Sequence, residues 1–191
     1  LFVRDVQFHG SVPDSVAAVD YDEDGDPEVR ALFVRHEVEQ LFSESGYEVV
    51  FVDIDEPLIA ALNARRGYAI RLVDNNWFKK VVVSPVQAFH TTESETVTQA
   101  LAKASIAATA VGVRALPHVA PLVAAGIARR AESGAETPLN IIICENLQDA
   151  AAAFRRMVSE YLPAAGLAYL ETNVGFVDTV IGRMVPPPTP E

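Results

Sequence analysis

The segment PLNIIICEN, residues 138–146, carries the clearest signal for the fold of this chain. Three β-branched residues, Ile141 to Ile143, are followed at once by the polar residues Cys144, Glu145 and Asn146. A short apolar run of this kind is typical of a buried parallel strand. Open α/β sheets bind ligands at the carboxyl ends of their strands. We therefore expect Glu145 and Asn146 to lie at a binding edge.

The sequence NVGFVDTVIGRMVPPPTPE, residues 173–191, predicts a second element of the same kind. Its apolar strand pattern is interrupted by one carboxylate, Asp178, which we expect at the same edge of the sheet. The prolines that follow, within 186–191, are typical of an extended linker.

From residue 46 to the end of the second segment, apolar strand patterns alternate with helical ones. Alternation at this spacing predicts crossover connections and a mostly parallel, doubly wound α/β sheet. We expect helices from Glu56-Pro57, over 92–104, 116–130 and 147–162, and strands over 47–53, 68–73, 79–84, 105–111 and 139–145, with an ending strand after 173.

The first part of the chain, residues 1–41, is atypical. Residues 1–9 are β-rich enough for a strand, 30–44 have near-helical spacing, and 20–28 (DYDEDGDPE) form an acidic loop. Asp20, Asp22, Asp24 and Gly25 match the first half of a calcium loop, but Ala31 occupies the twelfth position, where a bidentate Glu is expected. A solvated loop is the favoured interpretation, and we predict no metal site.

Composition limits the possible functions. The 191 residues are 50% hydrophobic, carry a formal net charge of −11 and include one cysteine. This charge disfavours nucleic acid and anionic membranes as partners. A single cysteine excludes an internal disulfide framework and fits a cytoplasmic protein.

Two strand ends are candidates for cofactor contacts. Asp53 ends an apolar strand at the place where dinucleotide-binding domains hold the adenosine ribose with a carboxylate, which would favour NAD over NADP. The alternative for Asp53 is a helix N-cap, since Asp55 and Pro57 follow closely. The small residues of TAVG, 109–112, would let backbone amides approach a pyrophosphate, although an ordinary strand-to-helix turn would look the same.

Taken together, IIICEN (141–146), TAVG (109–112) and NVGFVDTVIGRMVPP (173–187) closely resemble the NAD-binding domain of the polyol-specific long-chain dehydrogenases that act on mannitol 1-phosphate. Two further matching segments are 45–73 and 108–130, and the resemblance covers roughly 42–188.

The resemblance implies a Rossmann-like domain over 42–185 and a linker, 186–191, to a C-terminal catalytic domain that this chain lacks. Members interconvert D-mannitol 1-phosphate and D-fructose 6-phosphate by hydride transfer with NAD, without a metal. The resemblance further implies that Asp53 binds the adenosine ribose. Thr109, Ala110, Val111 and Gly112 would line the pyrophosphate, Glu145 and Asn146 would approach the nicotinamide, and Asp178 would face the reacting oxygen.

The chain departs from the family at its start. Counting back from Asp53 places Val29, Ala31 and Val34 at the positions of the phosphate-loop glycines. Either residues 1–40 have been replaced, or the first strand is 1–9 with an altered connection. The family's general base is a lysine of the C-terminal domain, so this chain alone should not catalyse. The leading hypothesis is the NAD-binding domain of such an enzyme, and the alternative is a degenerate structural or interaction module that does not bind nucleotide.

Overall fold

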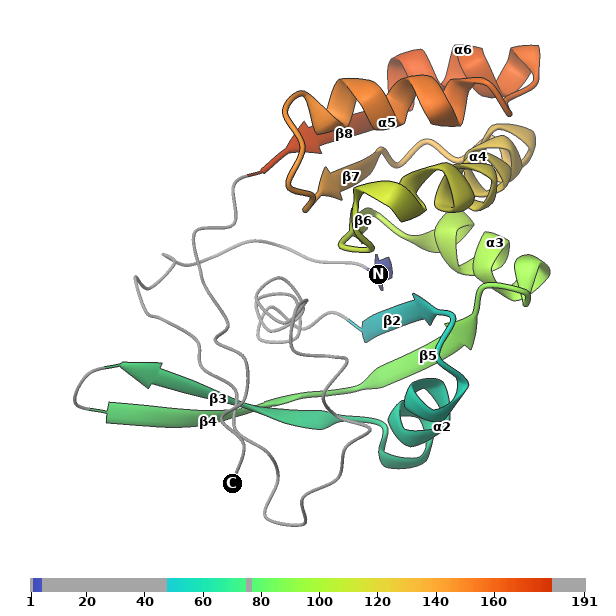
Figure 1. The fold of residues 1–191 in the computed structure, drawn as a ribbon. Coiled ribbons are helices and arrows are strands. Elements are labelled where there is room, and N and C mark those ends of the chain that lie inside the picture. Colours follow the sequence, from blue (N-terminus) through green and yellow to red (C-terminus); the bar gives the residue numbers. More distant parts are fainter. Residues whose placement is uncertain (1, 5–47, 75–76, 180–191) are drawn as a thin grey trace.

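The computed structural model of the chain describes residues 2–4, 48–74 and 77–179, which contain a six-stranded sheet and a separate two-stranded hairpin (Figure 1). Strands β1 (Phe2–Arg4), β2 (Glu48–Asp53), β5 (Val86–His90), β6 (Ile106–Thr109), β7 (Leu139–Ile143) and β8 (Val174–Asp178) form the large sheet in the order β5-β2-β1-β6-β7-β8. Counted within this sheet, the order is the 3-2-1-4-5-6 of a doubly wound fold. The predicted α/β class is therefore confirmed.

Five strands of the large sheet run in one direction. β2 pairs in parallel with β5, and β6 and β8 pair in parallel with β7. β1 is antiparallel to both β2 and β6, which makes those two strands parallel to each other. The carboxyl ends of all five strands consequently meet at one edge, which we call the carboxyl edge; the opposite edge is the amino edge.

The strand β1 occupies the central position of the sheet in the reverse direction. Phe2 lies between Val50 of β2 and Ala107 of β6. A strand within residues 1–9 was one of the two possibilities from sequence, and the structure places residues 2–4 of it in this position. Its last residue, Arg4, pairs with the first residue of β2 and therefore lies at the amino edge.

Helices cover the two faces of the large sheet. α2 (Glu56–Arg65) packs on one face, where Leu58 and Leu62 join Val49 and Phe51 of β2 in a smaller core. α3 (Ser94–Lys103), α4 (Leu116–Ser133), α5 (Ala150–Ser159) and α6 (Ala164–Asn173) cover the other face. The continuous apolar run of β2, with Val50 and Val52 turned to this second face, is what a sheet buried on both sides requires.

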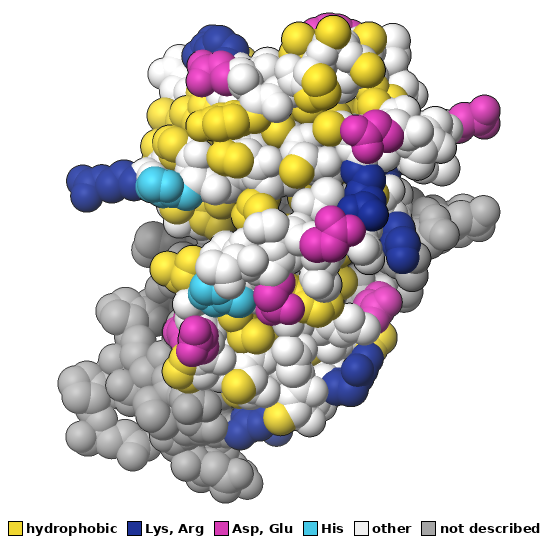
Figure 2. All heavy atoms as spheres, turned by 90° about the vertical axis from the view of Figure 1, so that its right-hand side faces the viewer, with side chains coloured by type: hydrophobic (Ala, Val, Ile, Leu, Met, Phe, Trp, Pro, Cys, Tyr) yellow, Lys and Arg dark blue, Asp and Glu magenta, His cyan; other side chains and the backbone are white. Residues whose placement is uncertain are grey.

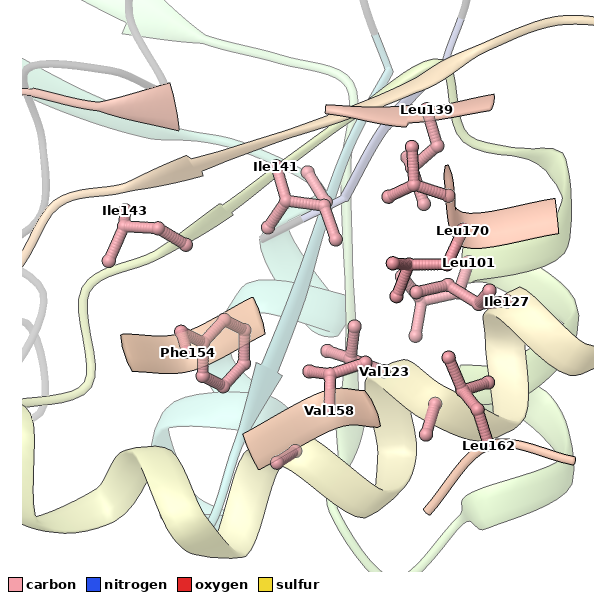
Figure 3. Close-up of a cluster of buried hydrophobic side chains, with 14 of the residues drawn as sticks. Leu101, Val123, Ile127, Leu139, Ile141, Ile143, Phe154, Val158, Leu162 and Leu170 are labelled. Carbon is pink, nitrogen blue, oxygen red and sulfur yellow. The ribbon is translucent and has the colours of Figure 1, made fainter. Parts of the chain in front are cut away.

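The larger core holds the second half of the sheet together. Figure 3 shows Ile141, Ile143 and Leu139 of β7 meeting Phe154 and other apolar side chains of the covering helices. Gly126 lets α3 and α4 approach closely, because a Cβ there would lie 2.5 Å from the Cβ of Leu101. This core fixes the positions from which β6 and β7 reach the carboxyl edge.

The hairpin of β3 (Tyr68–Asp74) and β4 (Trp77–Val83) extends away from the large sheet (Figure 1). Both strands were predicted, but the structure pairs them antiparallel with each other rather than within the parallel sheet. Val83 and Val81 of β4 are buried in the smaller core, so this end of the hairpin is anchored to the domain.

Two elements were not predicted from sequence. β5 is short, and its pattern VQAFH has no long apolar run. Asn63 of α2 supports this edge strand by donating to the Ala88 carbonyl and accepting from the Ala88 amide, both at 2.8 Å. The predicted helix 147–162 is α5 alone, and a second helix, α6, follows Pro163 at its N-cap.

Several expectations fall outside the described residues. They are the acidic loop and its calcium alternative, the helix over 30–44, the positions of the phosphate-loop glycines and the proline-rich end. Within the described ranges, no helix has the length and apolarity that a membrane span needs.

Candidate functional site

A pocket opens at the carboxyl edge between the ends of β2 and β6. Its volume is about 380 Å³, which lies in the range of small-molecule sites. From register, Asp53 and Ala110 each lie three residues beyond the level of Phe2. Among the described residues, no strand fills the space between these two ends. The lining is mostly apolar and comes from β2, β6, β7, α3, α4 and the loops at this edge: Val52, Asp53, Ile54, Thr91, Val97, Ala107, Ala108, Thr109, Val111, Ala115, His118, Val119, Leu122, Val123 and Ile141.

Asp53 places a half-buried carboxylate at the rim of this pocket. Its Oδ1 accepts hydrogen bonds from the amides of Ile54, at 2.7 Å, and Asp55, at 3.3 Å. The N-cap of α2 is Asp55, whose Oδ1 accepts from the Leu58 amide at 3.1 Å. Asp53 is thus not the helix cap that the sequence left as its alternative role.

The strand β5 brings His90 beside Asp53, because these two residues pair across the strands. One ring nitrogen of His90 lies 2.6 Å from Thr92 Oγ1, and the other lies 3.3 Å from the Ile54 carbonyl oxygen. These contacts join the turn after β5 to the turn after β2. Sequence reasoning missed this side of the pocket because it did not predict β5.

The apolar wall of the pocket comes largely from the first turns of α4. His118, Val119 and Leu122 line it from this helix. The sequence had indicated an amphipathic helix over 116–130, so the signal for these residues was present. What the sequence did not indicate is that the first turns of this helix would also line a pocket next to the end of β2, while the rest of its apolar face packs in the larger core.

Thr109 contributes a buried hydroxyl to the pocket region. The residue is 4% exposed, and its Oγ1 has no hydrogen-bond partner within the described parts of the chain. Buried polar atoms are usually satisfied, and leaving one unpaired costs about 1–3 kcal/mol. Thr109 lines the pocket, but its hydroxyl oxygen is itself buried, so it would contact a group in the pocket only after rotation of the side chain.

Glu145 connects the loops that follow β6 and β7. Its Oε1 accepts a hydrogen bond from the Val111 amide at 2.8 Å, and its Oε2 accepts one from the Gly112 amide at 2.9 Å. The structure thus brings together Glu145 and the 109–112 segment, two groups that the sequence had placed at the same edge. Asn146, next in the chain, is exposed.

Asp178 lies at the end of β8, level with Ile143 of β7. Its Oδ1 accepts a hydrogen bond from the Ala151 amide at 2.8 Å, in the first turn of α5. A carboxylate at a helix N-terminus satisfies a free amide and interacts favourably with the helix dipole. The structure therefore gives Asp178 a structural contact, and the residue is nevertheless exposed at the carboxyl edge.

Charges around the domain are mixed in sign. Figure 2 shows acidic and basic side chains scattered over one face, with hydrophobic side chains gathered toward its upper part. Among the described residues, no group of three or more His, Cys, Asp or Glu side chains is arranged to hold a metal ion. The pocket itself combines apolar walls with the Asp53 carboxylate at its rim. This combination suits a flat apolar ring that is attached to a group with hydroxyls.

A doubly wound sheet with an apolar pocket at its carboxyl edge, and an acidic residue ending the second strand, defines a Rossmann-type nucleotide-binding domain. Residues 32–189 match the family model of the mannitol dehydrogenase Rossmann domain. The chain belongs to this family.

Comparison with named relatives agrees with this family. Mannitol-1-phosphate 5-dehydrogenase of Lactococcus lactis is 35% identical over 148 residues, and the enzyme of the same name from Streptococcus mutans is 36% identical over 148 residues. The enzyme of that name from Enterococcus faecalis is 36% identical over 147 residues. Each alignment covers 77% of this chain and 38% of the relative, so the chain corresponds to well under half of each relative's length.

Proposed function

We propose that this chain is the NAD-binding domain of a dehydrogenase that interconverts D-mannitol 1-phosphate and D-fructose 6-phosphate. The observation that carries the proposal is the apolar pocket between β2 and β6 with the Asp53 carboxylate at its rim. The adenine ring would occupy the pocket, against Val119 and Leu122 of α4. Asp53 would then accept hydrogen bonds from the ribose hydroxyls.

The chemistry of the rim favours NAD over NADP. A 2′-phosphate would lie next to the carboxylate of Asp53, where like charges repel and the ribose loses a hydrogen-bond donor. The buried Thr109 hydroxyl, which has no partner among the described residues, would supply a further polar contact for the adenosine half once its side chain rotates toward the pocket.

With the adenosine half at β2, the dinucleotide would cross the edge toward β7 and β8. The 109–112 segment would lie beside the pyrophosphate, and Glu145 and Asn146 near the nicotinamide. Asp178, two strands from β6, would face the substrate side. NAD supplies the hydride acceptor for oxidation of the polyol phosphate. The sugar phosphate and the general base would be held by a C-terminal domain, so we expect this chain alone to bind cofactor without turnover.

A second candidate is a module of this fold that no longer binds nucleotide. The observation in its favour is the direction of β1, which runs antiparallel to its neighbours, so that its last residue, Arg4, lies at the amino edge. In the doubly wound dinucleotide-binding fold the first strand runs parallel to its neighbours and ends at the carboxyl edge.

Titration with NADH, followed by its fluorescence, distinguishes the two candidates. We expect saturable binding by the wild-type chain. Because Asp53→Asn removes a charged hydrogen-bond acceptor, we expect it to raise the Kd for NADH about tenfold and to narrow the preference over NADPH. Glu56→Gln, an exposed charge change three residues away, is the matched control and should leave the Kd unchanged. Absence of any response at millimolar NADH would support the second candidate instead.

A further inference from the structure

The carboxylate of Glu145 is fully engaged with one short stretch of backbone. Its two oxygens accept from consecutive amides, Val111 at 2.8 Å and Gly112 at 2.9 Å, more than thirty residues away in sequence. Hydrogen bonds from amides to a carboxylate are short and about twice as strong as those between neutral groups. Glu145 therefore ties the loop after β7 to the turn after β6.

These hydrogen bonds decide what else the two amides can do. Each backbone amide has one hydrogen, and here both hydrogens are directed to Glu145. A pyrophosphate approaching the same amides would have to displace a carboxylate and would be repelled by its charge. The amides of Val111 and Gly112 are consequently poor candidates for direct phosphate donors.

The turn held by Glu145 forms part of the pocket. Val111 lines the pocket, and Gly112 has φ +86°, a conformation that few other residues adopt without strain. A 3₁₀ turn begins at Val113, and α4 begins at Leu116. The turn thus determines both the position of Val111 and the point at which α4 starts to wall the pocket with Val119 and Leu122.

We propose that Glu145 is a positioning residue for the cofactor: it holds the Val111–Gly112 turn in the shape that the adenosine pocket requires, and these two amides do not bind the pyrophosphate. This inference rests on the proposed NAD-binding function and refines the role of the 109–112 segment within it. Glu145 thus affects the affinity for NAD indirectly, by holding Val111, which lines the pocket.

Substitution of Glu145 tests the proposal by the sign of its effect on NADH binding. Gln keeps one acceptor oxygen but presents an NH₂ group to the other amide, whereas Ala removes both acceptors. We expect Glu145→Gln to raise the Kd for NADH about fivefold and Glu145→Ala to raise it about twentyfold, because the turn loses one and then both hydrogen bonds to a charged group. Exposed Glu132, changed to Gln, is the control for net charge and should leave the Kd unchanged.

The opposite sign overturns the proposal. If Glu145 instead occupies amides that the pyrophosphate needs, both substitutions free those amides, remove a repulsive charge and lower the Kd. A Kd that is unchanged in both variants equally contradicts a positioning role.

Amide hydrogen exchange in the cofactor-free chain provides an independent readout. We expect the amides of Val111 and Gly112 to exchange faster in Glu145→Ala while the β7 amides of Ile141 and Ile143 keep their rates, which separates a local effect from unfolding. Unchanged exchange at Val111 and Gly112 would overturn the inference while leaving NAD binding intact. A wild-type chain that does not bind NADH at all would overturn the proposed function and this inference together.

Discussion

The two edges of the large sheet differ in how their buried polar groups are arranged. At the amino edge, Arg130 of α4 is 1% exposed. Its guanidinium donates to the carbonyls of Ala102 and Ala104, before β6, and of Thr137, before β7, and to the hydroxyl of Tyr169 on α6. At the carboxyl edge, the half-buried carboxylates of Asp53 and Glu145 lie at the ends of β2 and β7, and Asp53 lines the pocket.

This difference indicates that the amino edge contributes mainly to stability and the carboxyl edge mainly to function. The planar guanidinium has five donors, and at the amino edge they hold together the segments that lead into β6 and β7. The carboxyl edge leaves a pocket at the ends of the strands, which is where open α/β sheets bind their ligands. Each edge also contains one buried hydroxyl without a partner among the described residues, Ser105 Oγ at the amino edge and Thr109 Oγ1 at the carboxyl edge. This pair allows the comparison to be tested with matched changes.

The largest effect on stability is expected at Arg130. Arg130→Met would leave several buried carbonyl oxygens without donors, and we expect a loss of at least about 3 kcal/mol in the free energy of unfolding. Urea denaturation at neutral pH measures it. Arg130→Lys should recover only part of the loss, because an ammonium cannot reproduce the planar fork. A loss below about 1 kcal/mol in the free energy of unfolding for Arg130→Met would contradict the stabilising role of the amino edge.

A smaller effect, of opposite sign, is expected at the unpaired hydroxyls. Thr109→Val removes a buried polar atom and keeps the shape of the side chain, so we expect it to raise the free energy of unfolding by about 1 kcal/mol. The same change should weaken NADH binding if the hydroxyl serves the ligand. Ser105→Ala, the matched change at the amino edge, should leave NADH binding unaltered. Equal effects of the two variants on the Kd would contradict a ligand role for Thr109.

The smallest effect is expected for an ion pair made by Arg129, the neighbour of Arg130. Arg129 donates to Glu95 at 2.6 Å, and the Glu95 side chain is largely in solvent, whereas that of Arg129 is about half-buried. The pKa of Glu95 lies below its ordinary value because Gln99 and Arg129 donate hydrogen bonds to the carboxylate. A lowered folded-state pKa gives stability above the unfolded-state value that is lost as the pH falls through the folded-state value.

We therefore expect Glu95→Gln to cost slightly at pH 7 and nothing at strongly acidic pH, as measured by urea denaturation at both. Exposed ion pairs contribute little, so the cost at pH 7 should be far below that of Arg130→Met. A cost that persists when the carboxylate is protonated would contradict this assignment.

The sequence predicted the parts of the fold that depend on local patterns. The apolar run before Glu145 predicted β7, and the runs before Asp53 and Thr109 predicted β2 and β6, with the polar ends that now lie at the carboxyl edge. The sequence did not predict β5, because this strand is stabilised by its pairing with β2 and by the hydrogen bonds between Ala88 and Asn63, which lie 25 residues apart in sequence. The sequence did not predict α6 either, because Pro163 and Gly166 interrupt the helical pattern of this segment, and the helix depends on its packing against the rest of the domain.

The candidate site was predictable in its location but not in its contacts. Asp53 and the 109–112 segment could be placed at one edge from their positions at strand ends. The hydrogen bonds of Glu145 to Val111 and Gly112 could not, because they join residues more than thirty positions apart through backbone amides. The burial of Arg130 could not be predicted either, because two adjacent arginines in the last turn of a helix fit the pattern of a solvated helix end.

Mapping NADH binding by NMR on the uniformly ¹⁵N-labelled chain tests the central claim, that the nucleotide binds at the carboxyl edge between β2 and β6. We expect progressive, saturable shifts of the amides of Ile54, Thr91 and Val111, which belong to the pocket, while those of Ala104 and Thr137 at the amino edge stay in place. Shifts centred on the amino edge, or no shifts at millimolar NADH, would contradict it.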